Sequence, residues 1–144
     1  MNIFAQYQID IPIKYQDQIK SYVTTGGTGS SKVNTPFLRQ IDFWYMALLV
    51  AFHKGFEPVV ERETYNAVTA EILSRNDYRI HHMQLIALAH FQDPSVLAEP
   101  RKILDYCLSL ANAGIPYVIS ILQSPDNLPM WNIFDEIEDM AEGN

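Results

Sequence analysis

The most restrictive feature of this sequence is an uninterrupted apolar run over residues 43–52. Its side chains are apolar all round a helix and not on one stripe, which is typical of a helix buried on most sides. His53, Lys54 and Gly55 follow, and cations before a glycine are a common helix end. Thr35 and Pro36 are typical of a helix start. The threonine hydroxyl can accept a hydrogen bond from a first-turn N–H, and proline lacks a backbone N–H that would be unpaired at this position anyway. We therefore predict a central buried helix over residues 35–54, with Trp44 inside the core.

Amphipathic patterns predict further helices on both sides of this segment. Residues 115–122 are ambiguous, because their β-branched side chains favour a strand while Pro116 and Pro125 suit a two-turn helix; we favour the helix. Gly114 is expected to end the helix before it. The predicted helices cover residues 15–25, 64–75, 78–92, 100–113, 115–122 and 129–141.

The N-terminal residues 1–14 are predicted to be extended. Polar and apolar side chains alternate over residues 6–14, as in a half-buried strand, and Pro12 places this strand at an edge or ends it there. An unpaired edge exposes backbone groups, so pairing of residues 6–13 with a second copy is expected to form a homodimer. Residues 26–34 are rich in glycine and serine and predict a flexible loop.

These elements predict a mainly α fold, a single domain over residues 1–144. It is a bundle of five to seven helices with a short N-terminal strand. A chain of 144 residues with 48% apolar side chains is large enough for one such core.

Charge and cysteine content restrict the partners and the compartment. The net charge of −7 is uneven: residues 1–60 carry +1, residues 61–100 carry −3 and residues 101–144 carry −5. This balance disfavours nucleic acid as a partner, although the N-terminal third is the place where it would bind. Cys107 is the single cysteine, so we expect a reducing, cytoplasmic setting. We find no signal-peptide pattern and no uninterrupted apolar run near the roughly 20 residues of a membrane span, so no membrane partner is expected.

No motif predicts catalytic residues, a metal site or a cofactor. The glycine-rich segment 26–32 lacks the Gly-Lys-Ser/Thr order of a phosphate loop, because Ser31 precedes Lys32. The histidines at 53, 81, 82 and 90 have poor spacing for joint metal binding. Arg39 and Asp42 are expected to form a local ion pair.

Two segments are candidates for interaction. The predicted C-terminal helix carries Trp131, Phe134, Ile137 and Met140, which either bind a partner or close the protein's own core. The N-terminal strand followed by a helix loosely resembles the ribbon-helix-helix order of dimeric DNA-binding regulators. In that alternative the DNA-binding residues are Gln6, Gln8, Lys14 and Lys20, although Asp10 on the same strand has the wrong charge.

A combination of short segments along the chain resembles small accessory proteins associated with bacterial DNA phosphorothioation (Dnd) systems. The segments are residues 11–17 (Ile-Pro-Ile-Lys-Tyr-Gln-Asp), Pro36-Phe37, residues 51–58 and residues 110–114. The resemblance implies a cytosolic bacterial protein that works with phage-defence machinery, and it transfers no functional residues.

Together these observations favour a non-enzymatic accessory or adaptor protein that binds a partner protein. A dimeric DNA-binding regulator is the alternative, and an enzyme with unrecognised site geometry is the second alternative.

Overall fold

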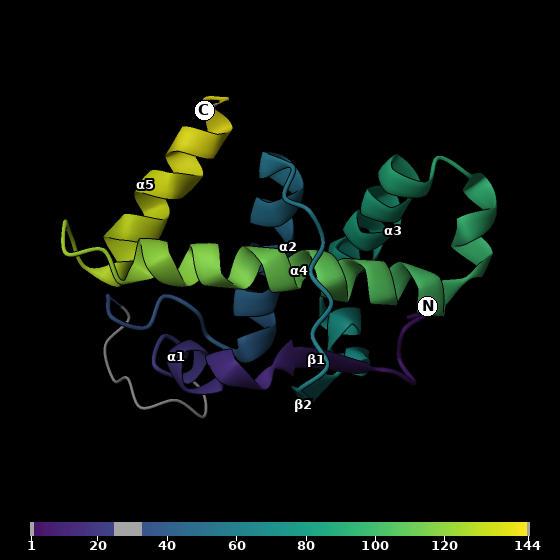
Figure 1. The fold of residues 1–144 in the computed structure, drawn as a ribbon, viewed down its shortest axis with the longest axis horizontal. Helices are drawn as coiled ribbons and strands as arrows, with labels where there is room; N and C mark the ends of the chain where they lie inside the picture. Colours follow the sequence, from purple (N-terminus) through teal and green to yellow (C-terminus); the bar gives the residue numbers. More distant parts are fainter. Residues whose placement is uncertain (1, 25–32, 144) are drawn as a thin grey trace.

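A computed structural model describes residues 2–24 and 33–143 of the chain. Within these residues, five α-helices dominate the fold and two short strands form a small antiparallel sheet (Figure 1), so the predicted mainly α class with a short N-terminal strand is confirmed. The elements are β1 (Gln8–Pro12), η1 (Ile13–Tyr15), α1 (Gln16–Lys20), α2 (Gln40–Lys54), β2 (Thr64–Thr69), η2 (Ala70–Arg75), α3 (Asp77–Phe91), η3 (Pro94–Ala98), α4 (Pro100–Leu122) and α5 (Pro129–Ala141).

The centre of the fold is the crossing of α2 and α4. Helix α4 runs along the long axis of the molecule and α2 crosses it at a steep angle (Figure 1). Trp44 and Phe43 are fully buried at this crossing, so the predicted sequestration of the central helix is confirmed. The predicted end of that helix is also confirmed, because Gly55 follows Lys54 with a φ of +70°.

The prediction that Gly114 ends a helix is wrong, because Gly114 lies inside α4. A Cβ at this position would lie 2.0 Å from the carbonyl oxygen of Ala47 on α2. Glycine is therefore required here by the close approach of two helix backbones and not by a positive φ. Residues 115–122 are helical, as we favoured, but they continue α4 and do not form a separate helix.

The predicted helix over residues 64–75 is wrong. Residues 64–69 form β2, which pairs antiparallel with β1, and residues 70–75 form the short 3-10 helix η2. Threonine, tyrosine and valine favour strands, and a neighbouring edge that offers backbone hydrogen bonds decides between the two conformations. The backbone groups on one side of β1 are thus paired within the chain, and Ile9 and Ile11 are fully buried.

Helix α2 begins at Gln40 and not at the predicted Thr35-Pro36. Residues 35–39 are not helical, and Phe37 forms an isolated parallel bridge with Val23, in which Thr24 N–H donates to the Phe37 carbonyl at 2.9 Å. The same bridge explains why the predicted helix over residues 15–25 is limited to η1 and α1. Of the predicted flexible loop at 26–34, residues 26–32 lie outside the described residues, and residues 33–34 form a turn.

Helix α4 is long and apolar enough, by length and composition alone, to span a membrane. Polar residues interrupt the apolar side chains of α4, so a search for uninterrupted apolar runs does not identify this helix as a membrane span. In the fold, 56% of its most apolar 18-residue window is buried inside the molecule, which is the environment of a core helix.

Candidate partner-binding surface

Helix α5 projects from the end of α4 and is anchored at its first turns (Figure 1). Pro129 occupies the first turn, where a missing N–H costs little. The side-chain amide of Asn132 donates to the carbonyls of Ser124 at 2.9 Å and Asn127 at 3.0 Å, which fixes the turn before the helix. Ile133 is buried beside it, and Asn132 and Ile133 are the two buried residues of α5.

Three large apolar side chains of α5 remain about half exposed. Trp131, Phe134 and Ile137 have exposed fractions of 47%, 49% and 43%, and we call these three residues the α5 flank. The rings of Trp131 and Phe134 meet edge to face with centroids 6.3 Å apart. Met140, the fourth predicted residue, is partly buried and packs against the core. The structure therefore brings three of the four predicted residues to one exposed surface.

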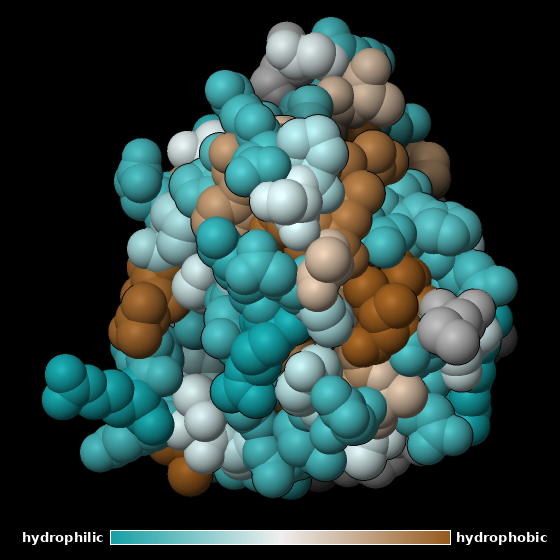
Figure 2. Space-filling view, turned by 90° about the vertical axis from the view of Figure 1, so that its right-hand side faces the viewer, coloured by the Kyte–Doolittle hydropathy of each residue, from teal (hydrophilic) through white to brown (hydrophobic). Residues whose placement is uncertain are grey.

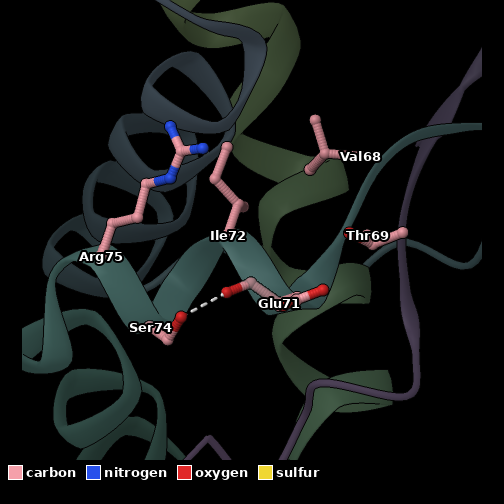
Figure 3. A pocket seen from close by; sticks show the side chains of 6 residues that line it. All are labelled: Val68, Thr69, Glu71, Ile72, Ser74 and Arg75. Carbon is pink, nitrogen blue, oxygen red and sulfur yellow. Dashed lines mark hydrogen bonds between the residues drawn. The ribbon is translucent and has the colours of Figure 1, made fainter.

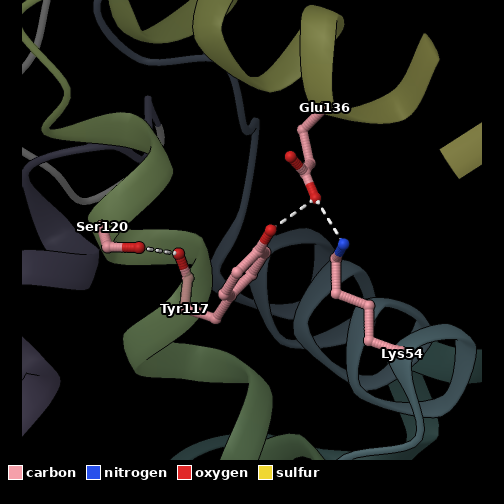
Figure 4. Close-up of polar contacts among 4 residues, drawn as sticks. All are labelled: Lys54, Tyr117, Ser120 and Glu136. Carbon is pink, nitrogen blue, oxygen red and sulfur yellow. Dashed lines mark hydrogen bonds and ion pairs between the residues drawn. The ribbon is translucent and has the colours of Figure 1, made fainter. Parts of the chain in front are cut away.

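A polar contact fixes the orientation of α5 on the body of the protein. Glu136 accepts a hydrogen bond from the hydroxyl of Tyr117 at 2.8 Å and forms an ion pair with Lys54 at 3.3 Å (Figure 4). The Lys54 ammonium also lies 5.2 Å from the centroid of the Tyr117 ring. Since these residues come from α5, α4 and α2, the contact joins three helices, and we call it the Glu136 clamp.

The surroundings of the Glu136 clamp alter its ionisation. Burial and the Glu136 carboxylate raise the pKa of the Tyr117 hydroxyl, and hydrogen bonds with Tyr117 and Glu136 raise the pKa of Lys54. Tyr117 therefore stays a neutral donor and Lys54 stays charged at physiological pH. In the sequence, Lys54 and Glu136 have no local pattern that connects them, so the clamp was not predicted.

The solvent side of α5 is acidic. Asp135, Glu138 and Asp139 are exposed, as is Glu142 directly after the helix. No lysine or arginine follows Lys102 in the sequence, so these carboxylates have no basic neighbours on their own helix. The α5 flank is therefore an apolar strip beside acidic side chains that form no ion pair among the residues the structure describes.

The residues of the DNA-binding alternative lie on successive N-terminal elements. Gln6 is exposed before β1, Gln8 is half-buried in β1 and Lys20 ends α1. Lys14 forms an ion pair with Glu61 at 2.8 Å, and the hydrogen bond with Glu61 raises the pKa of Lys14. The charge of Lys14 is thus already offset within the chain, and the DNA-binding function stays a prediction.

A polar cluster between α2 and α3 was not predicted. Arg79 is buried and forms an ion pair with Asp42. The predicted ion pair between Asp42 and Arg39 is therefore wrong. Arg39 contacts this carboxylate through its backbone N–H, which donates to Asp42 at 3.1 Å. The Tyr45 hydroxyl contacts Nδ1 of His82, and burial raises the pKa of Tyr45 to about 12. These contacts connect α2 to α3 in the folded protein.

The described residues contain no group of three or more metal-ligand side chains of the histidine, cysteine, aspartate or glutamate type. Cys107 is buried in the core, and this burial raises the pKa of its thiol, so it is a poor nucleophile at neutral pH.

Shallow hollows and apolar patches also occur away from α5. A hollow of about 450 Å³ lies along η2, where the Ser74 hydroxyl donates to the Glu71 carbonyl at 2.7 Å (Figure 3). On the side that carries α3, several apolar patches lie among hydrophilic residues (Figure 2). Apolar exposure alone therefore does not distinguish α5. What distinguishes it is a helix face beside acidic residues that have no ion pair within the described part of the chain.

The chain matches no family of known proteins, no curated protein and no solved structure. Its function is therefore argued from the geometry above.

Proposed function

We propose that this protein is a non-enzymatic accessory protein that binds a partner protein through the α5 flank. The observation that carries the proposal is the half exposure of Trp131, Phe134 and Ile137 on an anchored helix. Tryptophan and tyrosine dominate the energetic centres of protein interfaces, and a rigid helix presents them at little entropic cost. The Glu136 clamp supports this function, because it holds the helix with the flank toward solvent.

The charge next to the flank defines the partner. The acidic residues Asp135, Glu138 and Asp139 repel acidic surfaces and attract basic ones. We infer that the partner supplies an amphipathic helix with an apolar face and lysine or arginine residues along its edge. Such helices bind apolar strips through side chains spaced three and four residues apart.

The resemblance to accessory proteins of DNA phosphorothioation systems suggests where to search for the partner. We propose that it belongs to the same phage-defence system. A DNA-binding regulator is the alternative, and it predicts that duplex DNA binds with a steep dependence on salt.

Copurification from the native host with a matched variant tests the proposal. The wild-type protein is expected to retain a stoichiometric partner that the double variant Trp131→Ala, Phe134→Ala loses, with affinity reduced at least about tenfold. Val60→Ala is the matched control, because Val60 is 83% exposed and lies far along the chain from α5. Retention of the same partner by the double variant would contradict the proposal.

Trp131 provides a direct reporter for this binding. The other tryptophan, Trp44, is fully buried, so changes in emission on binding come from Trp131. A synthetic basic amphipathic helix is expected to shift the emission to shorter wavelength, and the Trp131→Phe variant is expected to show no shift. An acidic helix of the same apolar pattern is expected to give no shift in either protein.

A further inference from the structure

A second candidate site is a hollow that the Tyr117 side chain helps to line. Residues 56–63, which we call the strap, leave α2 and cross α4 without regular secondary structure before they enter β2 (Figure 1). Val59 N–H donates to the carbonyl of Ser109 at 2.8 Å, and the Asn112 side-chain amide donates to the carbonyl of Val59 at 2.9 Å. Between the strap, η1 and α4 lies a hollow of about 490 Å³, which we call the strap hollow.

Aromatic rings form much of the wall of the strap hollow. Tyr15, Phe56 and Tyr117 line it, and the rings of Phe56 and Tyr117 meet edge to face with centroids 5.4 Å apart. Two of these rings already bind cations of the chain: the ammonium of Lys14 lies 5.2 Å from the Tyr15 centroid, and that of Lys54 lies 5.2 Å from the Tyr117 centroid. The wall therefore has the chemistry that attracts a positively charged group.

Asn112, which lines the hollow, has a side-chain oxygen without a hydrogen-bond donor among the described residues. Asn112 is 8% exposed, and its Oδ1 is buried and accepts no hydrogen bond from the described residues. Pro116 lies four residues later in α4 and has no N–H, so the Asn112 backbone carbonyl lacks its usual helical donor. A buried acceptor without a partner is costly, and a ligand that donates N–H groups removes that cost.

Two carboxylates also belong to the lining of the hollow. Glu57 and Glu61 both line the hollow, and Glu61 is paired with Lys14. Glu57 is exposed and takes part in none of the ion pairs formed by residues 2–24 and 33–143. One carboxylate is thus available to a cation that enters the hollow.

We propose that the strap hollow binds an alkylguanidinium group, which is the chemistry of an arginine side chain or of a free guanidine. A planar guanidinium stacks on aromatic rings, and its N–H donors reach a carboxylate and an amide oxygen together. Its alkyl stem fits the apolar part of the lining, and the volume lies in the range of small-ligand sites. The site is separate from the α5 flank and does not depend on the proposed partner.

The test is a titration of the folded protein with n-butylguanidinium, followed by amide chemical shifts in NMR. Binding is expected to shift the backbone N–H signals of the strap and of residues 112–117, apart from Pro58 and Pro116, which have no N–H. The uncharged analogue n-butylurea, which has nearly the same shape, is expected to bind at least about fivefold more weakly because it lacks the cation. Equal binding of the two probes, or no binding of n-butylguanidinium, would overturn the proposal.

Two variants with opposite expected effects sharpen this test. Glu57→Gln is expected to weaken n-butylguanidinium binding about threefold, while Lys14→Gln is expected to strengthen it, because Lys14 competes for the Tyr15 ring and for Glu61. Glu71→Gln, an exposed glutamate on the η2 hollow, is the matched control and is expected to change nothing. Weaker binding to Lys14→Gln would contradict the proposal.

A comparison of two probes identifies the source of the guanidinium. An acetyl-Gly-Arg-Gly-amide peptide that binds more tightly than n-butylguanidinium indicates an arginine of a partner protein, and the reverse order indicates a free guanidine. The double variant Trp131→Ala, Phe134→Ala is expected to bind both probes as the wild type does. Failure of the α5 proposal and failure of this one therefore give different results.

Discussion

Arg79 of α3 forms an ion pair with Asp42 of α2, and the arginine side chain is almost completely buried. Asp42 also accepts the backbone N–H of Arg39, the residue that precedes α2. One carboxylate therefore caps the central helix and holds the neighbouring helix in place. The Arg79 guanidinium also lies 5.3 Å from the ring centroid of Tyr45, which adds a cation–π contact.

Removal of one partner from this pair is expected to destabilise the protein strongly. Asp42→Ala leaves the buried Arg79 without its counter-charge and removes the cap, so we expect a loss of about 3 kcal/mol in the free energy of unfolding. Urea unfolding measures this loss. The double variant Asp42→Ala, Arg79→Met is expected to recover part of it, and a double variant as unstable as the sum of both single variants would contradict the coupling.

Replacement of Gly114 by alanine tests the helix crossing. The added Cβ would overlap the Ala47 carbonyl, so α2 and α4 must separate, and we expect a loss of about 3 kcal/mol or more in the free energy of unfolding. Gly55→Ala is the matched control. A Cβ added at Gly55 has no neighbour within 4 Å. The expected loss in the free energy of unfolding is about 1 kcal/mol and comes from the positive φ alone. Equal losses would show that the helices have room to separate.

The Glu136 clamp is expected to control the local stability of α5. Tyr117→Phe removes the donor to Glu136, and about 1 kcal/mol of stabilisation is expected to be lost. Amide hydrogen exchange in the second half of α5 is expected to become faster, while exchange in α3 stays unchanged. Ser120→Ala is a control on the same helix, since the Ser120 hydroxyl donates within α4 to the Tyr117 carbonyl. Faster exchange in both variants would contradict the role of the clamp.

Stability is expected to fall in alkaline solution. Burial raises the pKa of Tyr45 and of Tyr65 from 10.0 to about 12 each, so the folded state favours the neutral phenols. A folded-state pKa above the unfolded value means that the stabilisation is complete below pH 10 and is lost as the pH rises toward 12. Urea unfolding between pH 9 and pH 11 measures this slope, and the Tyr45→Phe, Tyr65→Phe variant is expected to show a shallower one.

Local patterns in the sequence predicted the elements whose burial follows a regular period. The C-terminal end of α2, both ends of α5 and the extent of α3 follow from apolar spacing, prolines and glycines that act within one element. Phe134 and Ile137 were predicted by their spacing to lie on the apolar face of the C-terminal helix, and Trp131 was a candidate as an aromatic side chain on the same acidic helix.

The sequence predictions that were wrong have a common cause, which is contact between distant parts of the chain. β2 became a strand because β1 lies beside it, and Gly114 is needed by the backbone of α2. The Glu136 clamp and the strap hollow join residues from three or more elements, so no local spacing reveals them. Tertiary context overrides propensity at these positions.

The pairing of β1 with β2 also has a consequence for the order of folding. Ile9 faces Val68 in the sheet, so the chain must close a large loop, with all of α2 inside it, before these strands can meet. Closure of such a loop is entropically costly and slow compared with the growth of a helix. During synthesis on the ribosome, β1 therefore stays unpaired until residues beyond Thr69 have emerged from the exit tunnel.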